Sequence, residues 1–214
     1  MAAEVRNFRE VGKKIVAVAR NYRAHAAEMK SSIPEKPIFF FKPTTAYLTK
    51  GHPIRFPPGC KVLHHEVELG VVLGKRASAV HKASAMQHIG GFVLALDMTA
   101  RDFQDEAKAK GEPWFLAKGF DGACPVSELI PPEQLPHPQS AHLWLKVNGE
   151  LRQDGNTNQM IFDIPHLLEY VTSFVALEPG DLLLTGTPHG VGPVISGDVI
   201  ECGVNDFAMT FVVA

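Results

Sequence analysis

Short segments of alternating or continuously apolar residues, bounded by Gly or Pro, recur along the whole chain. Half-buried strands alternate and strands covered on both faces are apolar throughout, so the pattern indicates β-structure. Helical spacing is rarer, and we therefore expect a mainly β protein with peripheral helices. The predicted strands are Lys14–Ala19, Ile38–Lys42, Glu66–Leu73, Phe92–Asp97, His142–Val147, Asp181–Thr185, Asp198–Cys202 and Ala208–Val213.

Apolar residues at helical spacing are confined to a few segments, which we expect to cover sheet edges. The Pro-rich segment Ile130–Pro138 is flanked by strand patterns, so it predicts a surface connection rather than a linker between domains. Residues 1–214 are therefore predicted to form one domain. The predicted helices are Tyr22–Lys30, Ala83–Met86, Thr99–Lys110 and Ile164–Phe174.

Three carboxylates stand on two of the predicted strands. Glu66 and Glu68 alternate with Val67 and Leu69, so both acids project from one strand face, and Asp97 ends the next apolar run. An unpaired carboxylate is costly to bury and either takes up a proton or binds a cation. Oxygen ligands favour Mg²⁺, Mn²⁺ or Ca²⁺ over Zn²⁺. The alternative is an acidic strand face in contact with water.

The composition limits the class of partner. The chain has 214 residues, 45% of them hydrophobic, and a net charge of −2 with no block of basic residues. Nucleic acid and anionic membranes are therefore not expected as partners, and a small molecule is favoured. Cys60, Cys124 and Cys202 are far apart, which indicates reduced thiols inside a cell. Glu4 and Glu10 interrupt the acid-poor pattern of a transit peptide, so targeting stays open.

A second group of polar residues follows Asp97. Arg101 and Gln104 are three residues apart and share a helical face, where Arg suits an anionic substrate and Gln can orient water. Lys118, in Trp114–Gly119, is either a poised cation or a lysine whose stem lies along apolar surface. Capping and surface ion pairs are the alternative for Arg101 and Gln104.

Two further motifs carry candidate chemistry. His25 and Glu28 have helical i, i+3 spacing, so the carboxylate can orient the imidazole as a base for water. A solvated helix face is the alternative. Thr187 lies in the Gly-rich segment Leu184–Pro193, whose hydroxyl and amides can bind an anionic oxygen, and a plain turn between strands is the alternative.

Taken together and in this order, these motifs resemble the fumarylacetoacetate hydrolase domain family, most closely its short branch of acylpyruvases and oxaloacetate decarboxylases. The resemblance covers nearly the whole chain. It rests on Ala19–Tyr22 with His25 and Glu28, His65–Gly70, Leu96–Asp102 with Gln104, Ala117–Lys118, and Leu184–Pro188 with Gly190–Gly192.

The resemblance implies a mixed β-roll or β-sandwich of the family's C-terminal domain type, a homodimer, and a mitochondrial location with the cytosol as the alternative. It implies that residues 20–36 include a mobile lid. It also implies Mg²⁺, with Mn²⁺ or Ca²⁺ as substitutes, held by Glu66, Glu68 and Asp97. The other site residues that it implies are catalytic His25, Glu28, Lys118 and Gln104 and substrate-binding Arg101, Thr187 and Arg20.

The activity implied is metal-dependent hydrolysis of 3-acylpyruvates to pyruvate and a carboxylate, with decarboxylation of oxaloacetate through the same enolate, which the metal would hold. His25, oriented by Glu28, would deprotonate a water held near Gln104, and Lys118 would stabilise the enolate. One alternative is a tautomerase that interconverts keto and enol oxaloacetate. Another is a non-catalytic protein that binds metal and dicarboxylate.

Overall fold

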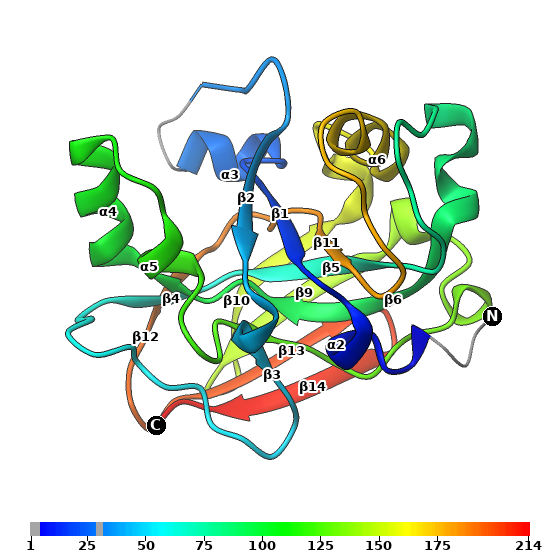
Figure 1. Cartoon of the computed structure of the whole chain (residues 1–214). Coiled ribbons are helices and arrows are strands. Elements are labelled where there is room, and N and C mark those ends of the chain that lie inside the picture. The colour runs from blue at the N-terminus through cyan, green and yellow to red at the C-terminus, as the bar shows by residue number, and fades with distance from the viewer. Residues whose placement is uncertain (1–4, 29–31) are drawn as a thin grey trace.

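The computed structural model describes residues 5–28 and 32–214, and in this part of the chain the strands form four sheets (Figure 1). In the large sheet β1 and β11 are parallel and the other neighbours antiparallel. Its order is β2 (Ile38–Lys42), β1 (Ile15–Ala19), β11 (Leu182–Leu184), β5 (Val67–Leu73) and β6 (Ile89–Leu96). The second sheet is antiparallel, in the order β10 (Glu150–Asn156), β9 (His142–Val147), β13 (Val199–Val204) and β14 (Phe207–Val212).

Two small sheets complete the β-structure. One is antiparallel, in the order β12 (Gly192–Val194), β4 (Leu63–His65) and β7 (Thr99–Ala100), and the other pairs β3 (Tyr47–Leu48) with β8 (Cys124–Pro125) in parallel. The helices lie around the sheets (Figure 1). They are α2 (Phe8–Val11), α3 (Arg23–Glu28), α4 (Arg101–Lys110), α5 (Phe115–Lys118) and α6 (Ile164–Thr172), with the 3₁₀ helices η1 (Thr44–Ala46), η2 (Lys82–His88), η3 (Pro132–Gln134), η4 (Pro138–Ser140) and η5 (Thr157–Gln159).

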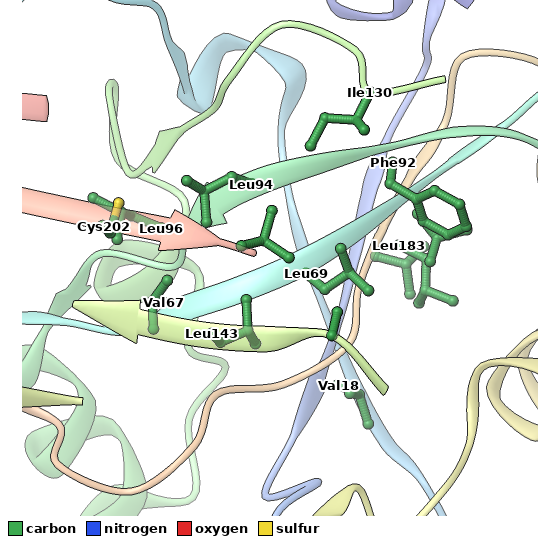
Figure 2. Close-up of a cluster of buried hydrophobic side chains, with 14 of the residues drawn as sticks. Val18, Val67, Leu69, Phe92, Leu94, Leu96, Ile130, Leu143, Leu183 and Cys202 are labelled. Carbon is green, nitrogen blue, oxygen red and sulfur yellow. The ribbon is translucent and has the colours of Figure 1, made fainter. Parts of the chain in front are cut away.

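The main core lies between the large sheet and the second sheet. Val67 and Leu69 of β5 pack in one buried cluster with Leu143 of β9 and Cys202 of β13 (Figure 2). The opposite face of the large sheet forms a second cluster that includes Phe8 of α2. Every residue of β5 is buried, as expected for a strand covered on both faces. Polar residues on β5 are therefore held in the protein interior.

The predicted fold class is confirmed, and each predicted strand is present: Ile38–Lys42 and His142–Val147 have the predicted bounds, and the others have shifted ends. β5 begins at Val67, not at Glu66, because the Val67 N–H donates to the side chain of Gln153. Ala83–Met86 was predicted as a helix and lies within the 3₁₀ helix η2. The segment Ile130–Pro138 is not purely a surface connection, because Ile130 is buried and bridges to Phe92.

The amphipathic pattern of Ile164–Phe174 is confirmed by α6, although the helix ends at Thr172. Its apolar face is buried in the main core. The Asp163 carboxylate accepts a hydrogen bond from the His166 N–H at 2.8 Å and so caps the first turn. Within the described ranges, no helix has the length and apolar character that a membrane crossing requires.

Candidate active site

Glu66, Glu68 and Asp97 converge in the protein interior. Glu68 lies in β5, Glu66 precedes this strand and Asp97 directly follows β6. The Asp97 N–H donates to the Glu66 carbonyl at 2.8 Å, which ties the two strand ends together. One oxygen from each carboxylate lies within 4.8 Å of the others. The three residues are only 6%, 1% and 1% exposed, so the alternative of an acidic face in water is wrong.

Two features of this carboxylate triad suit a divalent cation. Asp97 Oδ1 is buried and accepts no hydrogen bond from any described residue. Burial and the charges of Asp97 and Glu66 raise the pKa of Glu68 well above its usual value, although the Gly186 N–H donates to Glu68 at 2.7 Å. A divalent cation would add positive charge among the three carboxylates and offset their repulsion. The all-oxygen donor set fits Mg²⁺, Mn²⁺ or Ca²⁺.

Lys118 and Arg101 supply positive charge to the triad. Lys118 Nζ donates to Asp97 Oδ2 at 2.6 Å and to Glu66 Oε2 at 3.0 Å, and Arg101 donates to Glu66 Oε1 at 2.6 Å. Burial alone would raise the pKa of Glu66 and lower that of Lys118. The ion pairs outweigh burial, so the pKa of Glu66 falls and that of Lys118 rises. Lys118 is a buried cation, and the alternative of a lysine stretched along apolar surface is wrong.

Lys42 is a buried cation of the site that sequence reasoning missed. It ends β2, is 1% exposed, and its Nζ lies 2.6 Å from Asp97 Oδ1. Nζ also donates to the carbonyls of Met98, Lys118 and Ala123, whereas its contact with Asp97 Oδ1 is an ion pair without hydrogen-bond geometry. Lys42 thus joins β2 to the segments on both sides of α4 and α5. Its only sequence signal was a cation at the end of an apolar strand.

Arg101 and Gln104 share a helical face, as their spacing predicted. Arg101 Nη1 donates to Gln104 Oε1 at 2.5 Å and Nε donates to His64 Nδ1 at 3.3 Å. Burial and the nearby Arg101 charge lower the pKa of His64 to about 4, so this ring is neutral and accepts. Three of the five guanidinium N–H groups are bonded within the protein, and two remain for a ligand. Gln104 retains its amide N–H groups as donors.

The structure pairs His25 with Glu28 at the end of α3. His25 Nδ1 lies 3.1 Å from Glu28 Oε2, which leaves Nε2 to take a proton. The Gly190 N–H donates to Glu28 Oε1 at 3.0 Å and so tethers α3 to the Gly-rich segment. His25 is 7% exposed, which makes the alternative of a solvated helix face wrong for this residue. Residues 29–31 lie outside the described residues; the predicted lid, residues 20–36, includes all three, and the predicted helix Tyr22–Lys30 includes residues 29 and 30.

The amides of the Gly-rich segment bind carboxylates of the protein itself, those of Glu68 and Glu28. Gly190 has φ +90° and a Cβ there would meet the Arg152 carbonyl, so the turn requires glycine. Thr187 donates its hydroxyl proton to the Val67 carbonyl at 2.8 Å and accepts from Gln153 Nε2 at 2.8 Å. The single proton of this hydroxyl is therefore already donated to the Val67 carbonyl, so the hydroxyl cannot donate to an anion in this arrangement.

Gln153 is a second residue that sequence reasoning missed. It is fully buried in β10, where its carbonyl oxygen accepts from the Val67 N–H and from His65 Nδ1, both at 3.0 Å. Its amide N–H groups donate to Thr187 Oγ1 and to the Pro188 carbonyl. Gln153 thereby fixes the start of β5 against the Gly-rich segment.

A cavity of about 390 Å³ connects these groups. It is lined by all the predicted site residues except Glu28, which reaches it through His25. Arg20 lies in this lining with the left-handed backbone angle φ 56°. Phe40, Lys108 and Trp114 also line the cavity and were not predicted. The site therefore combines around one cavity a buried triad of oxygen ligands, paired cations and a histidine whose Nε2 has no hydrogen bond to any described residue.

Comparison with known proteins identifies the family of this chain. The model of the fumarylacetoacetate (FAA) hydrolase C-terminal family matches residues 14–213. The chain belongs to this family. The resemblance drawn from the motifs is therefore confirmed.

Relatives in this family have closely similar sequences. The chain is 55% identical to the mitochondrial oxaloacetate tautomerase FAHD1 of Homo sapiens, over 95% of this chain and 93% of the relative. It is 52% identical to the mitochondrial oxaloacetate decarboxylase of Dictyostelium discoideum, over 92% of this chain and 91% of the relative. These relatives are enzymes named for oxaloacetate. Their names also bear out the mitochondrial location that the resemblance implied.

Solved structures share the fold. A fumarylpyruvate hydrolase from Pseudomonas aeruginosa, solved with Mn²⁺ and pyruvate, has a TM-score of 0.91 at 34% identity and covers 95% of this chain and 90% of its own. The yeast protein ynq8, a fumarylacetoacetate hydrolase family protein, has a TM-score of 0.86 at 35% identity, with 97% and 95% covered. A neighbour with a divalent ion and a 2-oxo acid supports divalent metal binding by the buried triad of this chain.

Proposed function

We propose that this protein is a metal-dependent enzyme that acts on 2-oxo acids through their enolates, with oxaloacetate as a substrate. The observation that carries the proposal is the placement of the buried triad, Lys118 and the His25 ring around one cavity. The relatives support it, since they are named oxaloacetate tautomerase or oxaloacetate decarboxylase. The principal reaction proposed is keto–enol tautomerisation of oxaloacetate.

Glu66, Glu68 and Asp97 would hold the metal, which is Mg²⁺ or Mn²⁺ in this proposal. When bound, such an ion acts as a Lewis acid toward the carboxylate and 2-oxo oxygens of a substrate. The carboxylates offer only oxygen ligands, which suits both ions. The Mn²⁺ in the Pseudomonas aeruginosa neighbour supports this choice of metals.

The protein residues supply the proton transfers. His25 donates its Nδ1 proton to Glu28, so its Nε2 is the base that removes a proton from C3 of oxaloacetate. Lys118 keeps its proton because Asp97 and Glu66 raise its pKa. Its ammonium therefore stabilises the negative charge that develops on the C2 oxygen. Return of the proton to that oxygen completes the tautomerisation.

The same residues support cleavage of carbon–carbon bonds as a second function. For a 3-acylpyruvate, His25 removes a proton from water, and the Gln104 amide donates to that water and orients it. The water oxygen attacks the distal carbonyl, and the pair of electrons in the broken bond passes to the pyruvate enolate beside Lys118. Decarboxylation of oxaloacetate yields the same enolate without water. The His25–Glu28 pair is the observation that favours the hydrolytic reaction.

Three features stay predictions: a single domain over residues 1–214, which the sequence pattern indicates, and the lid over residues 20–36 and the homodimer, which the family resemblance implies. The contact between the Gly190 N–H and the Glu28 carboxylate, which holds the end of α3 to the Gly-rich segment, supports the lid prediction. Release of that contact would move His25 relative to the triad. We include all three features in the proposed function.

The proposal is tested with purified protein under two conditions, Mg²⁺ or Mn²⁺ present and excess chelator present. Conversion of enol to keto oxaloacetate is followed by ultraviolet absorbance, and pyruvate is measured after incubation with oxaloacetate and with acetylpyruvate. We expect metal-dependent tautomerisation, with pyruvate formed more slowly. If oxaloacetate and acetylpyruvate both remain unchanged and yet raise the melting temperature, the protein is a non-catalytic binder and the proposal is wrong.

A further inference from the structure

Lys108 is a cavity residue with no part in the proposed chemistry. Arg101, Gln104 and Lys108 have i, i+3 and i+7 spacing in α4, which places them along one helix face. All three line the cavity. Arg101 contacts the triad directly, whereas Lys108 lies two helical turns farther along α4 and is 39% exposed. It is therefore a cation near the opening of the cavity.

The deeper cations are already paired, whereas Lys108 is only weakly so. Lys118 and Arg101 form ion pairs of 2.6 to 3.0 Å with the triad. The ion pair of Lys108 within the described residues is with Asp105, at 3.7 Å and on the solvent side, where Asp105 is 63% exposed. Such an exposed, long pair contributes little. The positive charge of Lys108 thus remains available to a ligand.

An aromatic wall holds Lys108 in place. Its Nζ lies 5.7 Å from the centroid of the half-buried Trp114 ring, and Trp114 in turn lies 5.8 Å from Phe40. A cation at this distance from an aromatic face is attracted to it. Burial and, secondly, the charge of Arg101 lower the pKa of Lys108, so Lys108 and Arg101 together make this end of the cavity electropositive.

We propose that Lys108 binds the second carboxylate of 2-oxo dicarboxylates and so makes the site select dianionic over monoanionic substrates. The inference rests on the proposed function, because that function places the 2-oxo carboxylate end of the substrate at the triad. The far end then extends toward the cavity opening and Lys108. Selection arises because a neutral far end leaves this cation without its partner.

Lys108 would also influence which reaction oxaloacetate undergoes. In decarboxylation the electron pair of the C3–C4 bond forms the C2–C3 double bond, the carbonyl π pair moves to the C2 oxygen, and carbon dioxide leaves. A proton from water later adds to C3 as the enolate returns to the ketone. The C4 carboxylate loses its charge in this step. A cation that binds this carboxylate therefore stabilises the ground state more than the transition state and slows the loss of carbon dioxide. Tautomerisation leaves the C4 carboxylate and its charge intact, so the Lys108 cation does not slow it.

The test compares oxaloacetate with its C4 methyl ester, which has the same carbon skeleton but one negative charge fewer. The ratio of kcat/KM for the two compounds is measured in the wild type, in Lys108→Gln and Lys108→Arg, and in Lys110→Gln. Lys110 is the matched control, since it lies on the same helix, pairs with Glu106 and does not line the cavity. We expect Lys108→Gln to lower the preference for oxaloacetate about fivefold, the effect of one partly exposed charge pair.

Lys108→Gln should also raise the ratio of pyruvate formed to enol converted, whereas Lys108→Arg should keep both ratios near those of the wild type. An unchanged preference in Lys108→Gln, or an equal change in Lys110→Gln, would overturn the inference while leaving the proposed function in place. The inference would also be overturned, with the proposed function left in place, if Arg20→Gln lowered the preference for oxaloacetate over its methyl ester and Lys108→Gln did not. A wild type that converts neither compound would remove the proposed function and this inference with it.

Discussion

At the scale of single residues, the site holds carboxylates and cations together in the interior, and Glu68 is the exception among them. Glu66 and Asp97 contact lysine or arginine nitrogens. Within the described residues Glu68 has no such ion pair, and its hydrogen bond comes from the Gly186 N–H. Because burial and the neighbouring carboxylates raise the pKa of Glu68, the metal-free protein keeps a proton there to a higher pH than an ordinary glutamate would. A metal ligand must be deprotonated, so this proton competes with the metal.

We therefore predict that Mn²⁺ binding releases a proton from Glu68 and strengthens as the pH rises. Below the raised pKa of Glu68, each unit of pH should increase affinity by up to about tenfold, and above it the affinity should level off. Titration calorimetry from about pH 6 to 8, in two buffers with different enthalpies of ionisation, measures both quantities. Affinity that does not change with pH, without proton release, would show that Glu68 is already ionised.

Lys42 is predicted to be a structural residue of the site. Lys42→Met would leave the carbonyls of Met98, Lys118 and Ala123 without their buried donor and would remove a charge beside Asp97. We expect the free energy of unfolding to fall by about 3 to 5 kcal/mol, since one partner of a buried ionic network is lost. Urea unfolding measures the change, with the exposed Lys36→Met as the control. A loss no larger than that of the control would contradict the role.

At the scale of elements, the loss of the α3 residue His25 should affect acylpyruvate hydrolysis and oxaloacetate decarboxylation differently, although both reactions form the pyruvate enolate. His25→Ala removes the base that activates water, so acetylpyruvate hydrolysis should fall by about 10² to 10⁴-fold. Oxaloacetate decarboxylation needs no base and should fall by less than about tenfold. Pyruvate release from the two substrates measures both losses. Arg23→Ala is the control, because Arg23 is exposed on the same helix. Equal losses in His25→Ala would argue against a water-activating base.

Elements with a periodic apolar pattern were predictable, because the positions that are buried on one or both faces are apolar and recur with the period of the element. β10 was missed because its residues are mostly polar and exposed, with Gln153 and Gly155 buried. A signal was nevertheless present, since Asn148 and Gly149 have φ values of 53° and 80° and form the Asn-Gly turn typical of a hairpin. Turn chemistry, not hydrophobic period, would have predicted this strand.

The residues of the candidate site also fall into two groups, those that the sequence could predict and those that it could not. Glu66, Glu68 and Asp97 could be singled out because carboxylates are unusual on apolar strands, and the motifs supplied the others. Lys42 and Gln153 could not, because their partners are distant in sequence: Lys42 contacts the carbonyls of residues 98, 118 and 123, and Gln153 lies 86 residues from Val67. Such contacts depend on how strands are paired, which no local pattern encodes.

At the scale of the whole molecule, the three carboxylates of the triad, which repel one another, lie beside the main core. β5 carries Glu68 on one face and Val67 and Leu69, which pack against the second sheet, on the other. The strand that supplies metal ligands is thus also a central strand of the fold, so metal binding and global stability are linked. A ligand that binds only the folded state raises the free energy of unfolding by an amount set by its concentration and affinity.

This linkage predicts that Mn²⁺ at about 100 times its dissociation constant raises the free energy of unfolding by about 2.7 kcal/mol. For a chain of this size the melting temperature should rise by about 5 to 10 °C.

Glu68→Gln keeps an acceptor for the Gly186 N–H and mimics the protonated acid, so the metal-free variant should melt within about 3 °C of the wild type. It should also lose most of the Mn²⁺ shift, because an amide is a poorer ligand and carries no charge. Melting curves of both proteins, with Mn²⁺ and with chelator, decide the point. A full shift in Glu68→Gln would place the stabilising metal elsewhere, whereas a lower melting temperature of the metal-free variant would show that the Glu68 carboxylate stabilises the fold without metal.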